Sequence, residues 1–149
     1  MKSLIFAGLV ALSACGGSAQ TGGSGAGKPA GQKTLYDRLG GIEPIKAVVH
    51  DFVQNLVADS RINGRFLNSD KAHLEQMLDD QICQETGGPC TYTGKSMEEV
   101  HTGMHITNDE FTALVEDLVK SLNKFNVPKA EQDELLGKLG GLKAKVVGL

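Results

Sequence analysis

Apolar residues recur every three or four positions along most of the chain beyond residue 44, which is the spacing of one face of an α-helix. The first run follows Pro44, and proline suits the first turn of a helix because the N–H it lacks would have no partner there. The second run follows Asp70, whose carboxylate can cap a helix. The apolar positions of these two predicted helices are Ile45, Val48, Val49, Phe52, Leu56 and Val57, then Leu74, Met77, Leu78 and Ile82.

Two capping boxes predict where two further helices begin. Ser96 lies three residues before Glu99, and Thr107 lies three before Glu110, so each pair can satisfy the first backbone N–H groups of its helix. Pro128 then begins a last helix. The apolar positions of the helix after Thr107 and of the last helix are Phe111, Leu114, Val115, Leu118, Val119, Leu122 and Phe125, then Leu135, Leu136 and Leu139.

Residues that favour turns separate these helices. Gly87-Gly88-Pro89 ends the second helix, since glycine adopts positive φ and proline cannot continue a helix. Asn126 can close the long helix in a left-handed conformation, and Gly140-Gly141 precedes a short tail. No segment shows the strict alternation of a β-strand, so the sequence predicts an all-α domain.

Composition narrows the classes of function. The chain has 149 residues, enough for one domain, and 40% of them are hydrophobic, so a core can form. Because there is no Trp and aromatics make up only 5%, aliphatic side chains must fill that core. The 15 basic and 18 acidic residues leave a net charge of −3 and no basic face, so we predict no binding to nucleic acid.

The first fifteen residues resemble a bacterial lipoprotein signal. Lys2 precedes an apolar run at residues 4–12, which is too short to span about 30 Å of hydrocarbon and instead predicts a signal peptide over residues 1–14. Leu12-Ser13-Ala14-Cys15 resembles a lipobox, which implies that Cys15 is lipidated and becomes the N-terminus. Gly16, in place of Asp, implies sorting to the outer membrane.

A tether follows this signal. Residues 15–33 are dominated by Gly, Ser, Ala and Gln, and such a composition cannot bury enough apolar surface to fold. At about 5–6 Å × √n, the tether spans roughly 23 Å. We therefore expect a folded domain over residues 34–149 that faces the periplasm and is held to the cell envelope by a membrane anchor at Cys15.

One histidine stands out because of where it lies. His101 follows the capping box at Ser96, in a helix confined between that box and the next one at Thr107. Isolated helices so short are marginal in water, so something else must hold this one, and a cofactor bonded to its histidine would do so. A lone histidine near an apolar face is nevertheless more often a packing residue than a ligand.

Three blocks of sequence carry a family resemblance. They are Leu35-Tyr36-Asp37-Arg38-Leu39-Gly40-Gly41; Phe52 through Asp59, with Arg61 and Phe66; and Thr86-Gly87-Gly88-Pro89 through Tyr92-Thr93-Gly94, Met97 and His101 to Ile106 and Phe111. In this order and spacing they resemble the group I truncated haemoglobins, over nearly all of residues 34–147. The resemblance implies a two-over-two helical sandwich that encloses haem b, with His101 as the proximal ligand of the iron.

The resemblance also implies the surroundings of the haem. The distal side, where a gas would bind, is expected to be a dry wall of Phe52, Val53, Leu74, Leu78 and Ile82. The residues expected to pack against the porphyrin are Tyr92, Met97, Ile106, Phe111 and Leu114. The implied function is reversible binding of O₂ or another diatomic gas, with a reductase that the sequence does not identify.

The distal side departs from the family pattern. Group I members commonly carry a tyrosine where this chain has Val53 and a glutamine where it has Leu78, and those groups donate hydrogen bonds to the partial negative charge on bound O₂. Such a bond contributes roughly 1.5–3 kcal/mol, which is about a 10- to 100-fold change in dissociation. We therefore predict weakly held oxygen unless Gln81 or Gln76 supplies a donor, and the same departure counts against efficient nitric-oxide dioxygenation.

Met77 offers an alternative to gas binding. It lies where certain relatives carry a distal histidine ligand, and a thioether can bind haem iron and raise its reduction potential. Iron held between His101 and Met77 would favour electron transfer or redox sensing, although Met77 can equally fill apolar space. Activity on nitric oxide or peroxide would need a distal acid–base or donor group that the sequence does not show, so no catalytic residue is assigned. A haem-free helical adaptor is the last alternative.

Cys83 and Cys90 bracket the Gly-Gly-Pro turn. In an exported protein such a pair usually forms a disulfide, and the chain reversal between the two residues makes closure plausible. The disulfide would pin the distal helix to the loop before His101, with a chain-entropy contribution of about 2.5 kcal/mol. A redox-active pair and two free thiols stay open as alternatives. The chain has no Cys-x-x-Cys-His, so covalent haem attachment is not indicated.

Overall fold

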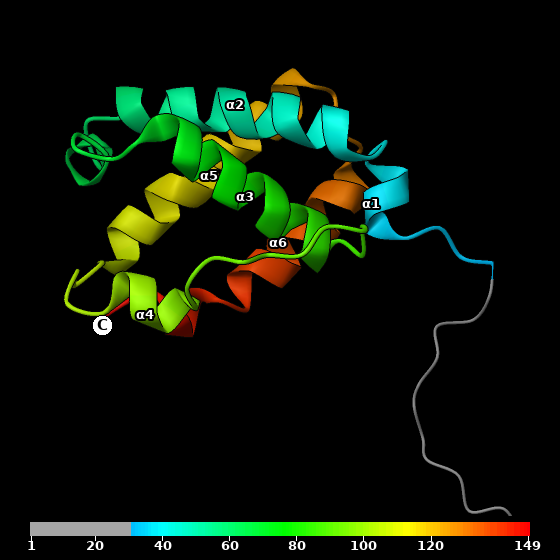
Figure 1. The fold of residues 1–149 in the computed structure, drawn as a ribbon. Helices are drawn as coiled ribbons and strands as arrows, with labels where there is room; N and C mark the ends of the chain where they lie inside the picture. Colours follow the sequence, from blue (N-terminus) through cyan, green and yellow to red (C-terminus); the bar gives the residue numbers. More distant parts are fainter. Residues whose placement is uncertain (1–30) are drawn as a thin grey trace, which may run out of the picture. The chain divides into compact units, whose positions relative to one another are not determined.

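The computed structural model describes residues 31–149 (Figure 1). The predicted signal peptide, Cys15 and most of the predicted tether lie outside the described residues and remain predictions. The elements are α1 (Leu35–Arg38), α2 (Ile42–Ala58), η1 (Asn63–Arg65), α3 (Lys71–Glu85), α4 (Met97–His101), α5 (Asn108–Lys124), α6 (Lys129–Gly140) and η2 (Lys143–Lys145), where η denotes a short 3-10 helix. Within residues 31–149 the only β feature is an isolated bridge between Ile106 and Val147, so the all-α prediction is confirmed.

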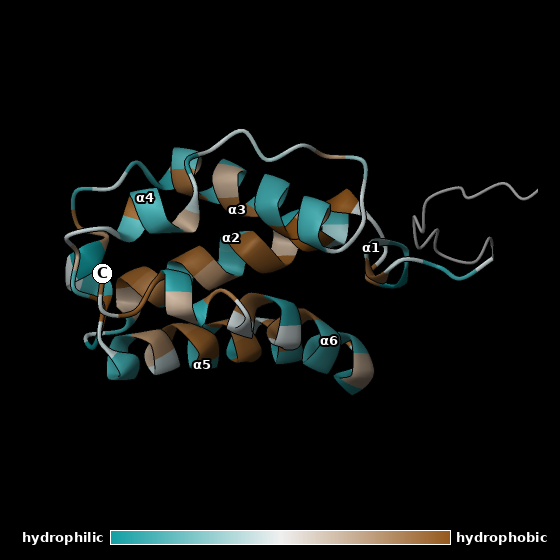
Figure 2. Cartoon of the chain, turned by 90° about the horizontal axis from the view of Figure 1, so that it is seen from below, coloured by the Kyte–Doolittle hydropathy of each residue, from teal (hydrophilic) through white to brown (hydrophobic). Residues whose placement is uncertain are grey.

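Two pairs of helices form the body of the domain. Helix α2 packs against α3, α5 packs against α6, and α2 joins the two pairs by packing against α5. Figure 2 shows α2 between α3 and α5, with much of its length hydrophobic. This arrangement is the predicted two-over-two sandwich. None of the helices in residues 31–149 is long and apolar enough to cross a membrane.

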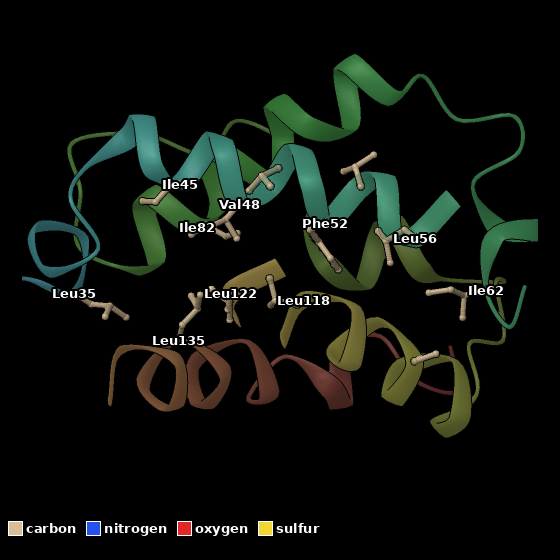
Figure 3. Close-up of a cluster of buried hydrophobic side chains, with 13 residues drawn as sticks. Leu35, Ile45, Val48, Phe52, Leu56, Ile62, Ile82, Leu118, Leu122 and Leu135 are labelled. Carbon is tan, nitrogen blue, oxygen red and sulfur yellow. The ribbon is translucent and has the colours of Figure 1, made fainter. Parts of the chain in front are cut away.

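The core lies where the inner faces of α2, α3, α5 and α6 meet (Figure 3). Helix α2 supplies the largest share, because its apolar residues return to the same faces at helical spacing. Val49, Val53 and Leu56 are at most 1% exposed. Burial of a side chain of this size contributes roughly 1.5–3 kcal/mol, so the seam along α2 holds both helix pairs together.

Local signals placed most helix ends correctly. Both predicted capping boxes are present, at the starts of α4 and α5. The Asp70 carboxylate accepts hydrogen bonds from two backbone N–H groups in the first turn of α3. Asn126 adopts a φ of 54° just after α5, as predicted. A further capping box, Thr34 with Asp37, opens α1 and was not predicted.

Phe125 is an exception to the predicted apolar face of α5. The helix ends at Lys124, so Phe125 is its C-terminal cap residue and is 42% exposed. The ammonium group of Lys124 lies 5.9 Å from the centre of the Phe125 ring and also pairs with Asp51 of α2. Helical spacing directs a side chain into the core only while the helix continues.

Asp79 of α3 is a half-buried carboxylate, and one of its oxygens has no hydrogen-bond donor in the described part of the chain. Burial raises the pKa of Asp79 from 3.8 to about 6; Lys46 opposes this rise, and Glu75, Asp80 and Glu43 add to it. Because the folded state binds this proton more tightly than the unfolded state does, stability is lost as the pH rises through this interval.

We expect Asp79→Asn to raise the melting temperature by roughly 2–4 °C at neutral pH, because the amide removes the cost of a partly buried charge. Near pH 4 the variant and the wild type should melt together, since both side chains are then largely neutral. Thermal denaturation at the two pH values checks this, with Asp80→Asn as the neighbouring control. An equal gain at both pH values would contradict an origin in ionisation.

Candidate functional site

Helix α4 carries His101 as its last residue and has no buried residue. It lies on the side of the domain away from α2 and packs against η2, beside the C-terminal end of the chain (Figure 1). A helix without buried residues gains little from the core. The contacts at its two ends therefore decide where His101 lies.

The imidazole of His101 is half-buried, and one ring nitrogen is already engaged. Its Nδ1 lies 2.7 Å from the carbonyl oxygen of Met97, one turn earlier in the chain. An Nδ1–H that donates to a carbonyl leaves the lone pair of Nε2 free, which is the usual arrangement in a metal-binding histidine. The sequence predicted the residue but not this bond, because a residue pattern does not show side-chain rotamers.

The chain's last residues form a C-terminal clasp on α4 and the loop after it. The Lys145 ammonium lies 3.3 Å from a carboxylate oxygen of Glu98. Two backbone hydrogen bonds strengthen the clasp: His105 N–H donates to Leu149 O at 2.7 Å, and Gly148 N–H donates to Ile106 O at 3.0 Å. From the sequence we expected only a short tail here, because hydrogen bonds between backbone groups do not depend on which side chains are present and so cannot be predicted from the sequence.

On its other side, the loop before α4 is fastened to α3. The disulfide between Cys83 and Cys90 is present, with Cα atoms 5.7 Å apart, which confirms the predicted pairing. Next to it, the Gln84 side-chain oxygen accepts a hydrogen bond from the N–H of Tyr92 at 2.8 Å. The last turns of α3 therefore hold the chain that leads to His101.

The two glutamines considered as donors to a bound gas lie in different surroundings. The Gln81 amide nitrogen donates to the sulfur of Met97 at 3.6 Å, so this donor faces α4. Gln76 is exposed. Neither the direction of the Gln81 amide nor the exposure of Gln76 favours a role in stabilising a ligand, and that role stays a prediction.

The predicted distal residues share one cluster. Phe52, Val53 and Ile82 are buried, with exposures of 3%, 0% and 4%. Leu74 and Leu78 of α3 are half-buried and pack against this cluster, as does Leu114 of α5. Figure 3 shows Phe52 and Ile82 inside it. Every one of these side chains is apolar.

Among the residues expected to pack against the porphyrin, Leu114 packs against this cluster. Tyr92, Met97, Ile106 and Phe111 are each half-buried, and the Lys143 ammonium lies 5.5 Å from the centre of the Phe111 ring. Met77 is half-buried as well, and its ligation to iron remains a prediction.

These residues fit haem. Apolar side chains that the core covers only in part offer the surface that a flat apolar cofactor would bury. They lie on α3, on α5 and around α4, and the free Nε2 of His101 offers one ligand to iron. The site therefore supplies both the apolar contacts and the ligand that haem requires.

An apolar cavity of about 230 Å³ lies elsewhere in the domain. Residues of α2, α5 and α6 line it together with the turn at residues 125–128. Its volume is below the range of about 300–1,000 Å³ that is usual for ligand pockets. Of the residues predicted to contact haem, only Ile82 lines it. This cavity is therefore not the candidate haem site.

Arg65 joins the η1 turn to the segment around the start of α5 and was missed by the sequence analysis. Its guanidinium donates to both carboxylate oxygens of Glu110, at 2.7 and 3.1 Å, and to the carbonyl oxygen of Met104 at 2.8 Å. The hydrogen bond from Arg65 is the main reason why the pKa of Glu110 falls to about 2. The partners are 45 and 39 residues from Arg65, too far apart for a local pattern to reveal them.

Comparisons with known proteins agree with this fold. The model of the bacterial-like globin family matches residues 34–147. A group 1 truncated haemoglobin of Tetrahymena pyriformis is 36% identical over 102 residues, 68% of this chain and 84% of that protein. One from Mycolicibacterium paratuberculosis is 31% identical over 113 residues, 76% of this chain and 83% of that protein. The crystal structure of T. pyriformis truncated haemoglobin in its Fe(III) form matches with a TM-score of 0.76 and 32% identity, covering 78% of this chain and all of that one.

The helical sandwich, together with these matches, defines a truncated globin. The chain belongs to the bacterial-like globin family and, within it, to the group I truncated haemoglobins. Haem b is the cofactor of this family, and a diatomic gas is its ligand. The resemblance found in the sequence is thereby confirmed.

Proposed function

We propose that His101 binds the iron of haem b and that the ferrous protein binds a diatomic gas reversibly. The observation that carries this proposal is the 2.7 Å contact between Nδ1 of His101 and the carbonyl oxygen of Met97, which orients the ring and leaves Nε2 for a metal. Haem supplies the ferrous iron at which the gas binds. The chain's own part is to fix the imidazole, keep water from the opposite side and set how firmly the gas is held.

The apolar distal side favours gases that need no hydrogen bond. Val53, Leu74 and Leu78 carry no donor, whereas bound O₂ has a partial negative charge that a donor would stabilise. Bound CO carries much less charge, so the absence of a donor affects it less. We therefore propose that the site releases O₂ quickly, favours CO over O₂ more than group I members with polar distal residues do, and does not dioxygenate nitric oxide efficiently.

Replacing His101 with Ala should remove the protein ligand to iron. We expect the purified wild type to show a five-coordinate, high-spin ferrous spectrum that converts fully with CO, and His101→Ala to lose this spectrum. Absorption spectra of the ferric, ferrous and ferrous-CO forms check this. His105→Ala is the matched control, because His105 is exposed and lies four residues further on.

An unchanged spectrum in His101→Ala would contradict the proposed ligand. A wild-type ferrous spectrum that is six-coordinate and low-spin, and that Met77→Leu converts to the five-coordinate form, would instead favour electron transfer. The absence of any haem absorption band would contradict both functions.

Leu78→Gln should slow the dissociation of O₂, because it restores a donor at the position where the family commonly has one. We expect roughly a 10- to 100-fold decrease in the rate constant, the equivalent of one hydrogen bond to a charged partner. CO dissociation should change far less. Stopped-flow measurements on both gases check this, with Leu78→Met as a control of similar size without a donor. Equal effects of the two substitutions would show that packing, and not the hydrogen bond, is responsible.

We also propose that the protein is exported and lipidated at Cys15, which would place the globin domain on the periplasmic side of the envelope, at the outer membrane. The support is the lipobox-like segment ending at Cys15, together with the Cys83–Cys90 disulfide, a bond typical of oxidising compartments.

Cys15→Ser should abolish lipidation and move the protein from the membrane fraction to the soluble fraction. Cells labelled with a fatty acid and then fractionated give the measurement. Cys90→Ser is the matched control, because it also replaces one cysteine with serine. It should keep the label, because Cys15 is intact. A wild-type protein that never takes up the label would contradict the anchor.

A further inference from the structure

Three contacts fasten the chain before His101 to the last turns of α3, and we call them the latch. They are the Cys83–Cys90 disulfide, the hydrogen bond from Tyr92 N–H to the Gln84 side chain at 2.8 Å, and the contact from the Gln81 amide to the Met97 sulfur at 3.6 Å. Each joins the helix that supplies the distal wall to the segment that carries the proximal histidine. The latch therefore limits how far the segment with His101 can move from α3.

The loop between these contacts is closely packed. A Cβ atom at Gly88 would lie 2.5 Å from the ring of Tyr36 and 2.7 Å from the sulfur of Cys83. Gly94 lies against the Tyr92 ring in the same way, and the Tyr92 hydroxyl donates to the Lys95 carbonyl at 2.9 Å. Because the loop has little freedom to move, a displacement of Cys90 would also displace Ser96, which caps the start of α4.

Helix α4 has little else to hold it. None of its residues is buried, so its attachments are its capping box, the C-terminal clasp and the latch. Of these, the disulfide is the one covalent bond that a cellular reductant can break. Its two sulfurs differ in access, because Cys83 is 0% exposed and Cys90 is half-buried.

We propose that Cys83 and Cys90 are positioning residues for His101 and that their disulfide makes haem retention depend on the redox state of the compartment. In the oxidised form the latch holds α4 at the distance from α3 that haem requires. In the reduced form the two hydrogen bonds of the latch remain but its covalent bond is lost, so α4 is held less firmly on that side and the protein loses haem faster. This inference rests on the proposed ligation of iron by His101.

The redox step needs a dithiol as reductant. One thiolate of the dithiol attacks the accessible sulfur of Cys90, and the Cys83 sulfur leaves as a thiolate that takes up a proton. The second thiol of the reductant then closes on the mixed disulfide and frees Cys90 as a thiol. Two electrons pass from the dithiol to the protein, so that one dithiol becomes a disulfide and the protein gains two thiols.

The test compares the oxidised and reduced full-length protein, purified in detergent and held in the ferrous-CO form so that the reductant leaves the iron unchanged. We expect haem transfer to an excess of a haem-free acceptor globin to be about tenfold faster after treatment with dithiothreitol, and to return to the slow rate on reoxidation. The Cys83→Ser/Cys90→Ser protein should lose haem quickly with or without the reductant. Equal rates for the oxidised and reduced wild type would overturn the proposal.

A second readout separates positioning from general stabilisation. In the ferrous protein without CO, the iron–histidine stretching frequency should shift on reduction, whereas a disulfide that only stabilises the fold would lower the melting temperature and leave this frequency unchanged. An unchanged frequency would therefore overturn the positioning role.

A third readout does not involve haem. In the haem-free protein, amide hydrogen exchange over residues 95–104 should accelerate on reduction, while exchange in α2 should not. If exchange accelerates but the protein takes up no haem, the proposed function fails and the latch stands. If exchange over these residues is unchanged, the latch fails even where haem binds.

Discussion

Burial of the apolar surface of α2 is the interaction on which the rest of the domain depends. The helix packs against α3 on one side and α5 on another, and Val49 and Val53 are fully buried between them. Two polar side chains of α2 pair with α5 along the same seam, since Ser121 donates to Asp51 at 2.9 Å and accepts from Asn55 at 2.8 Å. The register of α2 against α5 is therefore set by both apolar contact and hydrogen bonds. With α2 in place, α3 and α5 have fixed positions on either side of the site.

Helix α4, which carries the candidate ligand His101, takes no part in this core. Helix α4 buries no residue, and its attachments lie in a constrained loop and a short C-terminal tail. A ligand that binds only the folded state stabilises it, so a bond from haem to His101 would add to the stability of the least supported helix. The same reasoning makes the position of His101 sensitive to contacts some distance away along the chain.

The apolar distal wall links ligand preference to packing. Val53 belongs to the central cluster of the core, and we predict it at the position where group I members commonly carry a tyrosine. A larger polar side chain there would have to displace core neighbours as well as reach the ligand. Leu78 is only half-buried, so a donor at that position would meet less resistance. With the proposed distal side, the same residues would therefore serve both the binding of the gas and the packing of the core.

The sequence by itself determined the features that depend on neighbours within about four positions along the chain. The capping boxes at Ser96 and Thr107 and the left-handed Asn126 all come from local hydrogen bonding and backbone preference, and they appear where expected. The family resemblance added what local physics could not, namely the two-over-two arrangement and the prediction that His101 binds iron. Phe125 shows the limit of periodicity, because a residue at helical spacing is left exposed when it lies at the end of its helix.

Only the tertiary structure decided the contacts between distant segments. No local rule connects the residues that these contacts join. Examples are the Arg65–Glu110 ion pair, the C-terminal clasp and the hydrogen bond from the Gln81 amide to Met97. A side chain takes its direction from the rotamer that packing allows, and that packing exists only after the helices have come together. The hydrogen bond that orients His101 joins residues only four positions apart, but it depends on a side-chain rotamer that the sequence pattern does not show.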